Sequence, residues 1–128
     1  EDNPWIVVAA EFELTPKPEA EVWEKMKELI GKRSASQPLD LPSAGSAFKR
    51  PVGGYASALV DECGLRGASI GGAQVSEKHA GFLVNKGGTA ADFLALIAHV
   101  QQVVMEQKGI MLEPEVRILG EDAPVTPA

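Results

Sequence analysis

Apolar and polar positions repeat with two different periods along the chain, and these periods predict most of its elements. Residues 5–14 form a β-branched and aromatic run that ends at Thr15-Pro16, which predicts a strand, although no neighbouring run offers an obvious partner. Residues 18–33 carry apolar side chains at helical spacing and predict an amphipathic helix. Residues 34–42 are polar and contain two prolines, so we expect a connecting loop.

Short elements of both kinds are predicted further along. Tyr55, Leu59 and Cys63 mark one side of a short helix that stops at Gly64, a common left-handed cap residue. Residues 69–75 and 82–85 predict two strands.

The last part of the chain has the clearest local signals. Thr89-Ala90-Ala91-Asp92 resembles a capping box, and the apolar stripe behind it predicts a helix that ends near Gly109. Residues 112–118 then alternate apolar and charged positions, the period of a strand with one buried and one polar face. Strands and helices that do not alternate regularly predict an α+β fold, with a small mixed or antiparallel sheet packed with two or three helices.

Composition and charge narrow the classes of function. The chain has 128 residues, 45% hydrophobic and 23% charged, which is ordinary for one compact domain. Its net charge of −6 disfavours a nucleic-acid partner. Cys63, His79 and His99 have neither disulfide nor metal-site spacing, so we expect no metal. We also expect a cytoplasmic location and no membrane contact, because the chain shows no membrane-length apolar run and no secretion signal.

Residues 42–51, PSAGSAFKRP, concentrate glycine, hydroxyls and two cations. Backbone N–H groups, Ser43, Ser46, Lys49 and Arg50 are groups that bind an anionic ligand when they converge. A loop of this composition is also common as a plain turn.

The same segment carries a resemblance to a known family. PSAGSAFKRP is similar to the serine segment of UDP-N-acetylenolpyruvoylglucosamine reductases, and QPLDLPSAGSAFKRP, ALVDECGLRG, GGAQVSEKHAGFLVN and LEPEVRILG occur in that family's order and approximate spacing. Together these segments cover nearly everything from Gln37 to Gly120. The segments KRSASQPLD and SEKHAGFLVN resemble those of the family's shorter form, type II, which lacks a substrate-covering loop.

The resemblance implies a flavoenzyme of bacterial peptidoglycan synthesis, hence of cell-wall formation and cell division. Such an enzyme uses FAD and NADPH to reduce UDP-N-acetylenolpyruvoylglucosamine to UDP-N-acetylmuramate. Residues 1–16 then correspond to the last strand of a missing FAD-binding domain, and residues 17–36 to an inter-domain helix and connector. Residues 37–120 correspond to the C-terminal, substrate-binding domain, and residues 121–128 to a flexible tail. We expect this piece alone to be inactive, since the flavin domain lies upstream in the family.

The resemblance also implies roles for particular residues. Ser46 matches the family's proton-donating serine, and Glu115 matches its carboxy-terminal catalytic glutamate. A turn hydroxyl and a solvent-facing strand carboxylate are the plain alternatives for these two. The residues expected to bind substrate are Gly45, Lys49, Arg50, Tyr55, His79 and Arg33. The rival hypothesis is a non-catalytic nucleotide-sugar-binding or interaction module that shares this domain.

Overall fold

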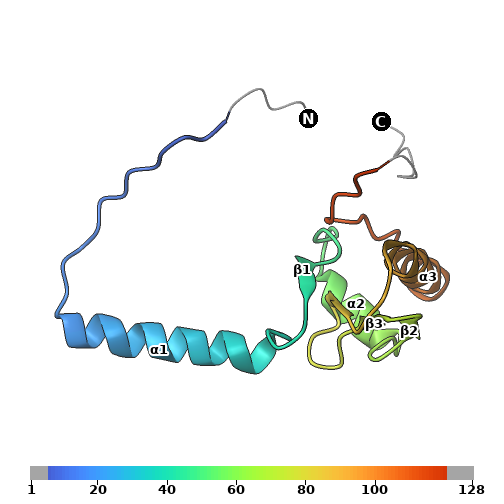
Figure 1. The fold of residues 1–128 in the computed structure, drawn as a ribbon, viewed down its shortest axis with the longest axis horizontal. Coiled ribbons are helices and arrows are strands. Elements are labelled where there is room, and N and C mark those ends of the chain that lie inside the picture. Colours follow the sequence, from blue (N-terminus) through green and yellow to red (C-terminus); the bar gives the residue numbers. More distant parts are fainter. Residues whose placement is uncertain (1–5, 121–128) are drawn as a thin grey trace. The chain divides into compact units, whose positions relative to one another are not determined.

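The computed structural model describes residues 6–120. The flexible tail expected over residues 121–128 and the first residue of the strand expected over residues 5–14 lie outside the described residues. The chain divides into two compact units, with the boundary between Lys32 and Arg33 (Figure 1).

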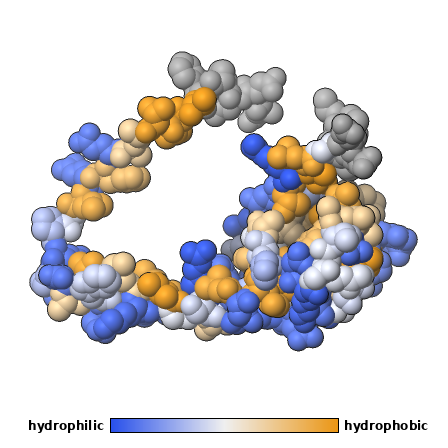
Figure 2. All heavy atoms as spheres, viewed as in Figure 1, coloured by the Kyte–Doolittle hydropathy of each residue, from blue (hydrophilic) through white to orange (hydrophobic). Residues whose placement is uncertain are grey.

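The first unit contains an extended segment and most of one helix. Residues 6–18 belong to no helix or strand, so the predicted strand over residues 5–14 is wrong for its described part. Ile6 and Val8 are 87% and 91% exposed, and Figure 2 shows apolar side chains along this segment. A strand needs a partner for its backbone N–H and C=O groups, and none of the described residues pairs with this one.

The predicted helix over residues 18–33 is confirmed as α1, Glu19–Ser36. It extends three residues into the predicted loop. Pro38 explains where it stops, because the residue before a proline is pushed out of the helical conformation, and that residue is Gln37. No helix within residues 6–120 has the length and apolar character needed to cross a bilayer.

The second unit contains an antiparallel four-stranded sheet of order β1-β4-β3-β2. Its strands are β1 Ser43–Ser46, β2 Ser69–Ile70, β3 Ala73–Val75 and β4 Phe82–Asn85. The single strand predicted over residues 69–75 is instead a hairpin of β2 and β3, because Gly71 at φ 53° and Gly72 turn the chain between them. The strand predicted over residues 82–85 is confirmed.

Two helices complete this unit, α2 Ala56–Glu62 and α3 Ala90–Lys108. Helix α3 contacts β2, β3 and α2, and its buried residues Leu96, Val100 and Val104 form the centre of the core. The predicted caps are confirmed: Gly64 and Gly109 have φ of 71° and 68°, and Thr89 forms a capping box with Asp92. The predicted α+β class is confirmed.

The strand predicted over residues 112–118 is wrong, because this segment makes only one isolated bridge, between Pro114 and Phe48. Proline has no N–H to donate to a ladder. The alternation itself is real: Leu112 is buried and Val116 and Ile118 are half-buried, while the charged residues between them are exposed. The segment therefore packs by alternate side chains without forming a regular strand.

Candidate active site

Ser46 lies at the end of β1, an edge strand that pairs with β4. The register pairs Ser43 with Val84 and Ser46 with Phe82, so β1 contains a bulge. Gly45 allows this bulge, since its φ of 85° is rarely adopted by residues with a side chain. Ser46 is exposed, and its hydroxyl makes no hydrogen bond within residues 6–120.

The backbone brings Glu115 beside Ser46. The carbonyl of Ala47, the next residue after Ser46, accepts a hydrogen bond of 2.9 Å from the N–H of Glu115. The N–H of Lys49 donates to the carbonyl of Glu113 at 2.8 Å, which fixes the same alignment one step further along. The two candidate catalytic residues, 69 positions apart in the sequence, are therefore held on adjoining exposed segments.

The two cations after Ser46 each have a local partner. Lys49 forms an ion pair with Glu113, and both side chains are largely exposed. The guanidinium of Arg50 lies over the Tyr55 ring, 4.1 Å from its centroid, and its Nε donates to the Gly54 carbonyl at 3.1 Å. An exposed cation over an aromatic ring contributes about 0.5–1 kcal/mol. The structure therefore brings two of the expected substrate-binding residues, Arg50 and Tyr55, into contact.

A polar depression of about 190 Å³ joins Tyr55 to His79. It is also lined by Arg66 and Lys78, which sequence reasoning did not single out. The signal for Arg66 was present in the matched segment ALVDECGLRG, whereas its position in space depends on the turn after α2. The complete lining is Tyr55, Ser57, Ala58, Asp61, Arg66, Lys78, His79 and Ala80.

Arg66 is held in this depression by Asp61. Its Nη2 donates to Asp61 Oδ2 at 2.7 Å, its Nε donates to the other carboxylate oxygen, and its Nη1 donates to the Glu77 carbonyl at 2.9 Å. The hydrogen bonds from Arg66 hold the pKa of the Asp61 carboxyl below its usual value. Such a two-point pair fixes the plane of a guanidinium, so one cation of the depression is oriented in advance.

Arg33, the remaining expected substrate-binding residue, is not brought to this group. Its Nε donates to Gln37 Oε1 at 3.0 Å on an exposed surface. Lys78, by contrast, reaches from the depression to the end of α1, where its Nζ donates to the Ser34 carbonyl at 2.5 Å.

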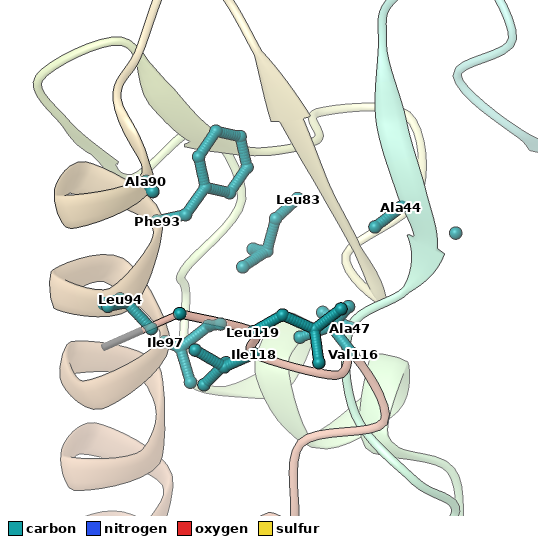
Figure 3. Close-up of a pocket in the computed structure, with 12 residues that line it drawn as sticks. Ala44, Ala47, Leu83, Ala90, Phe93, Leu94, Ile97, Val116, Ile118 and Leu119 are labelled. Carbon is teal, nitrogen blue, oxygen red and sulfur yellow. The ribbon is translucent and has the colours of Figure 1, made fainter. Parts of the chain in front are cut away.

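An apolar cavity of about 440 Å³ lies between β1, β4, α3 and residues 116–120 (Figure 3). Gly45 and Ala47, on either side of Ser46, line it together with Val116, which follows Glu115. Phe93 and Ile97 of α3 close the opposite wall. The lining offers few groups that could hydrogen-bond to a polar ligand.

Backbone N–H groups at a helix N-terminus are a common site for a phosphate, and three of those just before α3 already have partners within the chain. Asn85 Oδ1 accepts from the N–H groups of Gly87 and Gly88 at 2.8 and 2.7 Å, and the Asp92 carboxylate accepts from Thr89 N–H at 2.8 Å. Within residues 6–120 no three His, Cys, Asp or Glu side chains gather as a metal site.

Fold and site together define a small α+β domain in which the backbone of Glu115 is bonded to the residue after Ser46, with cations and a polar depression on the same unit. A family profile described as UDP-N-acetylenolpyruvoylglucosamine reductase, C-terminal domain, matches residues 37–119. The chain belongs to this family.

Known proteins of that description resemble the chain closely. It is 57% identical to the UDP-N-acetylenolpyruvoylglucosamine reductase of Agathobacter rectalis over 91% of its own length, and 52% identical to that of Exiguobacterium sibiricum over 93%. The crystal structure of the Thermus caldophilus reductase superposes with a TM-score of 0.66 at 36% identity, covering 82% of this chain and 37% of that one. The chain spans 38% and 40% of the length of the first two relatives.

Proposed function

We propose that this chain binds the UDP-sugar and delivers the proton in an FAD-dependent reductase that uses NADPH to convert UDP-N-acetylenolpyruvoylglucosamine to UDP-N-acetylmuramate in peptidoglycan synthesis. The observation that supports the proposal is the backbone hydrogen bond from Glu115 to Ala47, which holds Glu115 against the residue that follows Ser46. A cytoplasmic location and the shorter form of the family belong to the same proposal.

The chemistry assigned to this chain is proton delivery. The flavin would supply a hydride to the methylene carbon of the enolpyruvyl group. We expect this chain alone to be inactive, because it spans only 38% and 40% of the length of the first two reductases it matches. Negative charge then develops on the adjacent carbon and its carboxylate. Such an enolate is basic enough to take the proton from a serine hydroxyl that is held in place. Ser46 loses its proton to that carbon and regains one from water, to which it is exposed.

Glu115 acts on the substrate carboxylate. Two bare carboxylates at close range repel each other, so Glu115 contacts it through a shared proton or a water molecule. Lys49 and Arg50 lie a few residues beyond Ser46, and we assign them to bind the pyrophosphate of the substrate. Tyr55 and His79, in the depression with Arg66 and Lys78, are the groups offered to the uridine end.

The two half-reactions of the reductase separate these roles. We expect Ser46→Ala to leave flavin reduction by NADPH unchanged and to slow the oxidation of reduced flavin by the enolpyruvyl substrate about 10²- to 10⁴-fold, the usual contribution of a positioned proton donor. Stopped-flow absorbance of the flavin measures both steps. Ser69→Ala, at an exposed serine of the opposite edge strand β2, is the matched control and should change neither.

Glu115→Gln tests the charge at nearly constant shape. We expect it to slow only the second half-reaction. If both Ser46→Ala and Glu115→Gln turn over like the wild type, the proposed function of this site is wrong. Equal damage to both half-reactions would also count against Ser46 as the donor.

A further inference from the structure

The loop between β3 and β4 is fixed by hydrogen bonds within itself. Ser76, only 3% exposed, accepts at Oγ from the N–H groups of Lys78 and His79 at 3.1 and 3.3 Å. The N–H of Ser76 donates to the Phe82 carbonyl at 2.9 Å, and the N–H of Phe82 donates to the His79 carbonyl at 3.0 Å. The backbone that carries His79 is therefore held by hydrogen bonds on both sides.

The imidazole of His79 is an acceptor in this loop. Its Nδ1 lies 3.1 Å from the donating N–H of Gly81, so Nδ1 carries no proton and the neutral ring is protonated at Nε2. The ring also packs edge-on against Phe82, with centroids 5.0 Å apart and planes at 78°. Phe82 is the register partner of Ser46.

Gly81 connects this loop to the Ser46 segment by a backbone hydrogen bond. Its carbonyl accepts from the N–H of Ala47 at 2.8 Å, and the carbonyl of Ala47 accepts from the N–H of Glu115 at 2.9 Å. Ala47 thus lies between the loop and Glu115, since its N–H donates to the loop and its carbonyl accepts from Glu115. A side chain at Gly81 would crowd this arrangement, since a Cβ there would lie 3.1 Å from both His79 Cε1 and Ser57 Cβ.

We propose that His79 is a positioning residue for Ser46 and Glu115, acting through the acceptor Nδ1 and the Gly81 peptide. The proposal rests on the proposed function, because it takes Ser46 as the proton donor. It is separate from the substrate contact expected of His79. That contact would use Nε2, which makes no hydrogen bond within residues 6–120 and belongs to a residue lining the depression.

Two substitutions distinguish positioning from substrate contact. In His79→Asn, Oδ1 replaces Nδ1 and accepts from the N–H two residues on, as in an Asx turn, while the ring and Nε2 are lost. His79→Leu removes both nitrogens at similar bulk. His99→Leu, at an exposed histidine of α3, is the matched control and should behave like the wild type.

The kinetic test uses the reductase that contains this domain. We expect His79→Leu to slow the oxidation of reduced flavin at saturating substrate about 10- to 100-fold, because small displacements of catalytic groups are costly. His79→Asn keeps the acceptor and should be slowed clearly less than His79→Leu at saturating substrate, whereas both variants lose Nε2 and should raise KM alike. If His79→Asn is as slow as His79→Leu, or His79→Leu is as fast as the wild type while Ser46→Ala is slow, the inference is wrong and the proposed function stands.

An NMR measurement on the 128-residue chain checks the structural step without catalysis. We expect a long-range ¹H–¹⁵N spectrum of the wild type to show Nδ1 unprotonated. The amide protons of Gly81 and Ala47 should be protected from exchange in the wild type and in His79→Asn, and should exchange faster in His79→Leu. Unchanged exchange of both amides in His79→Leu would overturn the proposed coupling, whereas a failure of Ser46→Ala to affect turnover would overturn the proposed function itself.

Discussion

Over residues 6–120, the two units of the chain both expose apolar side chains, but only the second unit also buries apolar side chains. In the second unit, Leu96 and Val100 of α3 are fully buried against the sheet and α2. In the first, Trp23 and Leu29 of α1 are each 53% exposed, and α1 buries no residue. The family profile matches residues 37–119, which lie within the second unit.

This difference shows what holds each element in place. Helix α1 is supported by contacts along its own surface, such as the ion pairs of Glu28 with Lys25 and Lys32. Pairs of this kind contribute about 0.2–0.5 kcal/mol each. Helix α3 has a capping box and a buried stripe, and burying a leucine side chain contributes about 1.5–3 kcal/mol. The candidate site therefore lies on the second unit, which has the buried core.

The largest effect should come from deleting a buried side chain. We expect Leu96→Ala to lower the free energy of unfolding of the second unit by about 2–5 kcal/mol, because the removed methyl groups leave a cavity. Leu29→Ala, the same substitution at the exposed position, should change it by less than about 0.5 kcal/mol. Urea titrations followed by amide NMR signals of α3 and α1 measure both. Equal losses would contradict the contrast between the two units.

A Gly→Ala substitution should have opposite effects on stability in the two units, and each effect should be smaller than that of Leu96→Ala. A Cβ at Gly72 would lie 2.2 Å from the backbone nitrogen of Gly88, so the β2–β3 turn and the start of α3 must move apart. We expect Gly72→Ala to destabilise the second unit by about 1–3 kcal/mol.

Gly31 in α1 is the matched position, because a Cβ there would meet nothing within 4 Å. Gly31→Ala should stabilise the helix by about 0.5–1 kcal/mol through its higher helix propensity. Circular dichroism measures the gain in helix content, and the same urea titration measures the loss at Gly72. A stabilising Gly72→Ala would show that the glycine contact is not required.

The elements that the sequence predicts correctly are those with local signals. Thr89, Asp92 and Gly109 define the ends of α3 by hydrogen bonds and backbone conformation that involve only neighbouring residues. Strand β1 was missed because Ser43-Ala44-Gly45-Ser46 has little strand propensity, and its pairing with β4 decides its conformation. Residues 6–14 have the opposite property, a strand-like composition without a paired strand among the described residues.

In the candidate site, too, some features could be predicted from the sequence and others depend on the fold. Ser46 and Glu115 were identified by resemblance, and periodicity correctly placed Glu115 on the exposed side of its segment. Their two segments are joined by hydrogen bonds between residues 47–49 and 113–115. This pairing could not be predicted, because the two segments are far apart in the sequence. Arg66 and the acceptor role of His79 Nδ1 depend on turn geometry, so neither was predicted.

The smallest effect concerns the carboxylates at Asp92 and Glu28, whose pKa values are both lowered but for different reasons. Hydrogen bonds from the Thr89 backbone and side chain lower the pKa of Asp92 below 3.8, and hydrogen bonds from Lys25 and then Lys32 lower the pKa of Glu28 below 4.5. A lowered pKa stabilises the fold above the unfolded value, and that stabilisation is lost as the pH falls through the folded value.

Acid should therefore weaken both helices below pH 3.8 to 4.5, but salt should act on only one of them. At 1 M salt the screening length is about 3 Å, so we expect the pKa of Glu28 to rise towards 4.5 while that of Asp92 stays low. Carboxyl ¹³C NMR titrations at low and high salt measure both groups in one sample. An equal rise at the two carboxylates would mean that Asp92, too, is stabilised by charge and not by the backbone N–H groups at the start of α3.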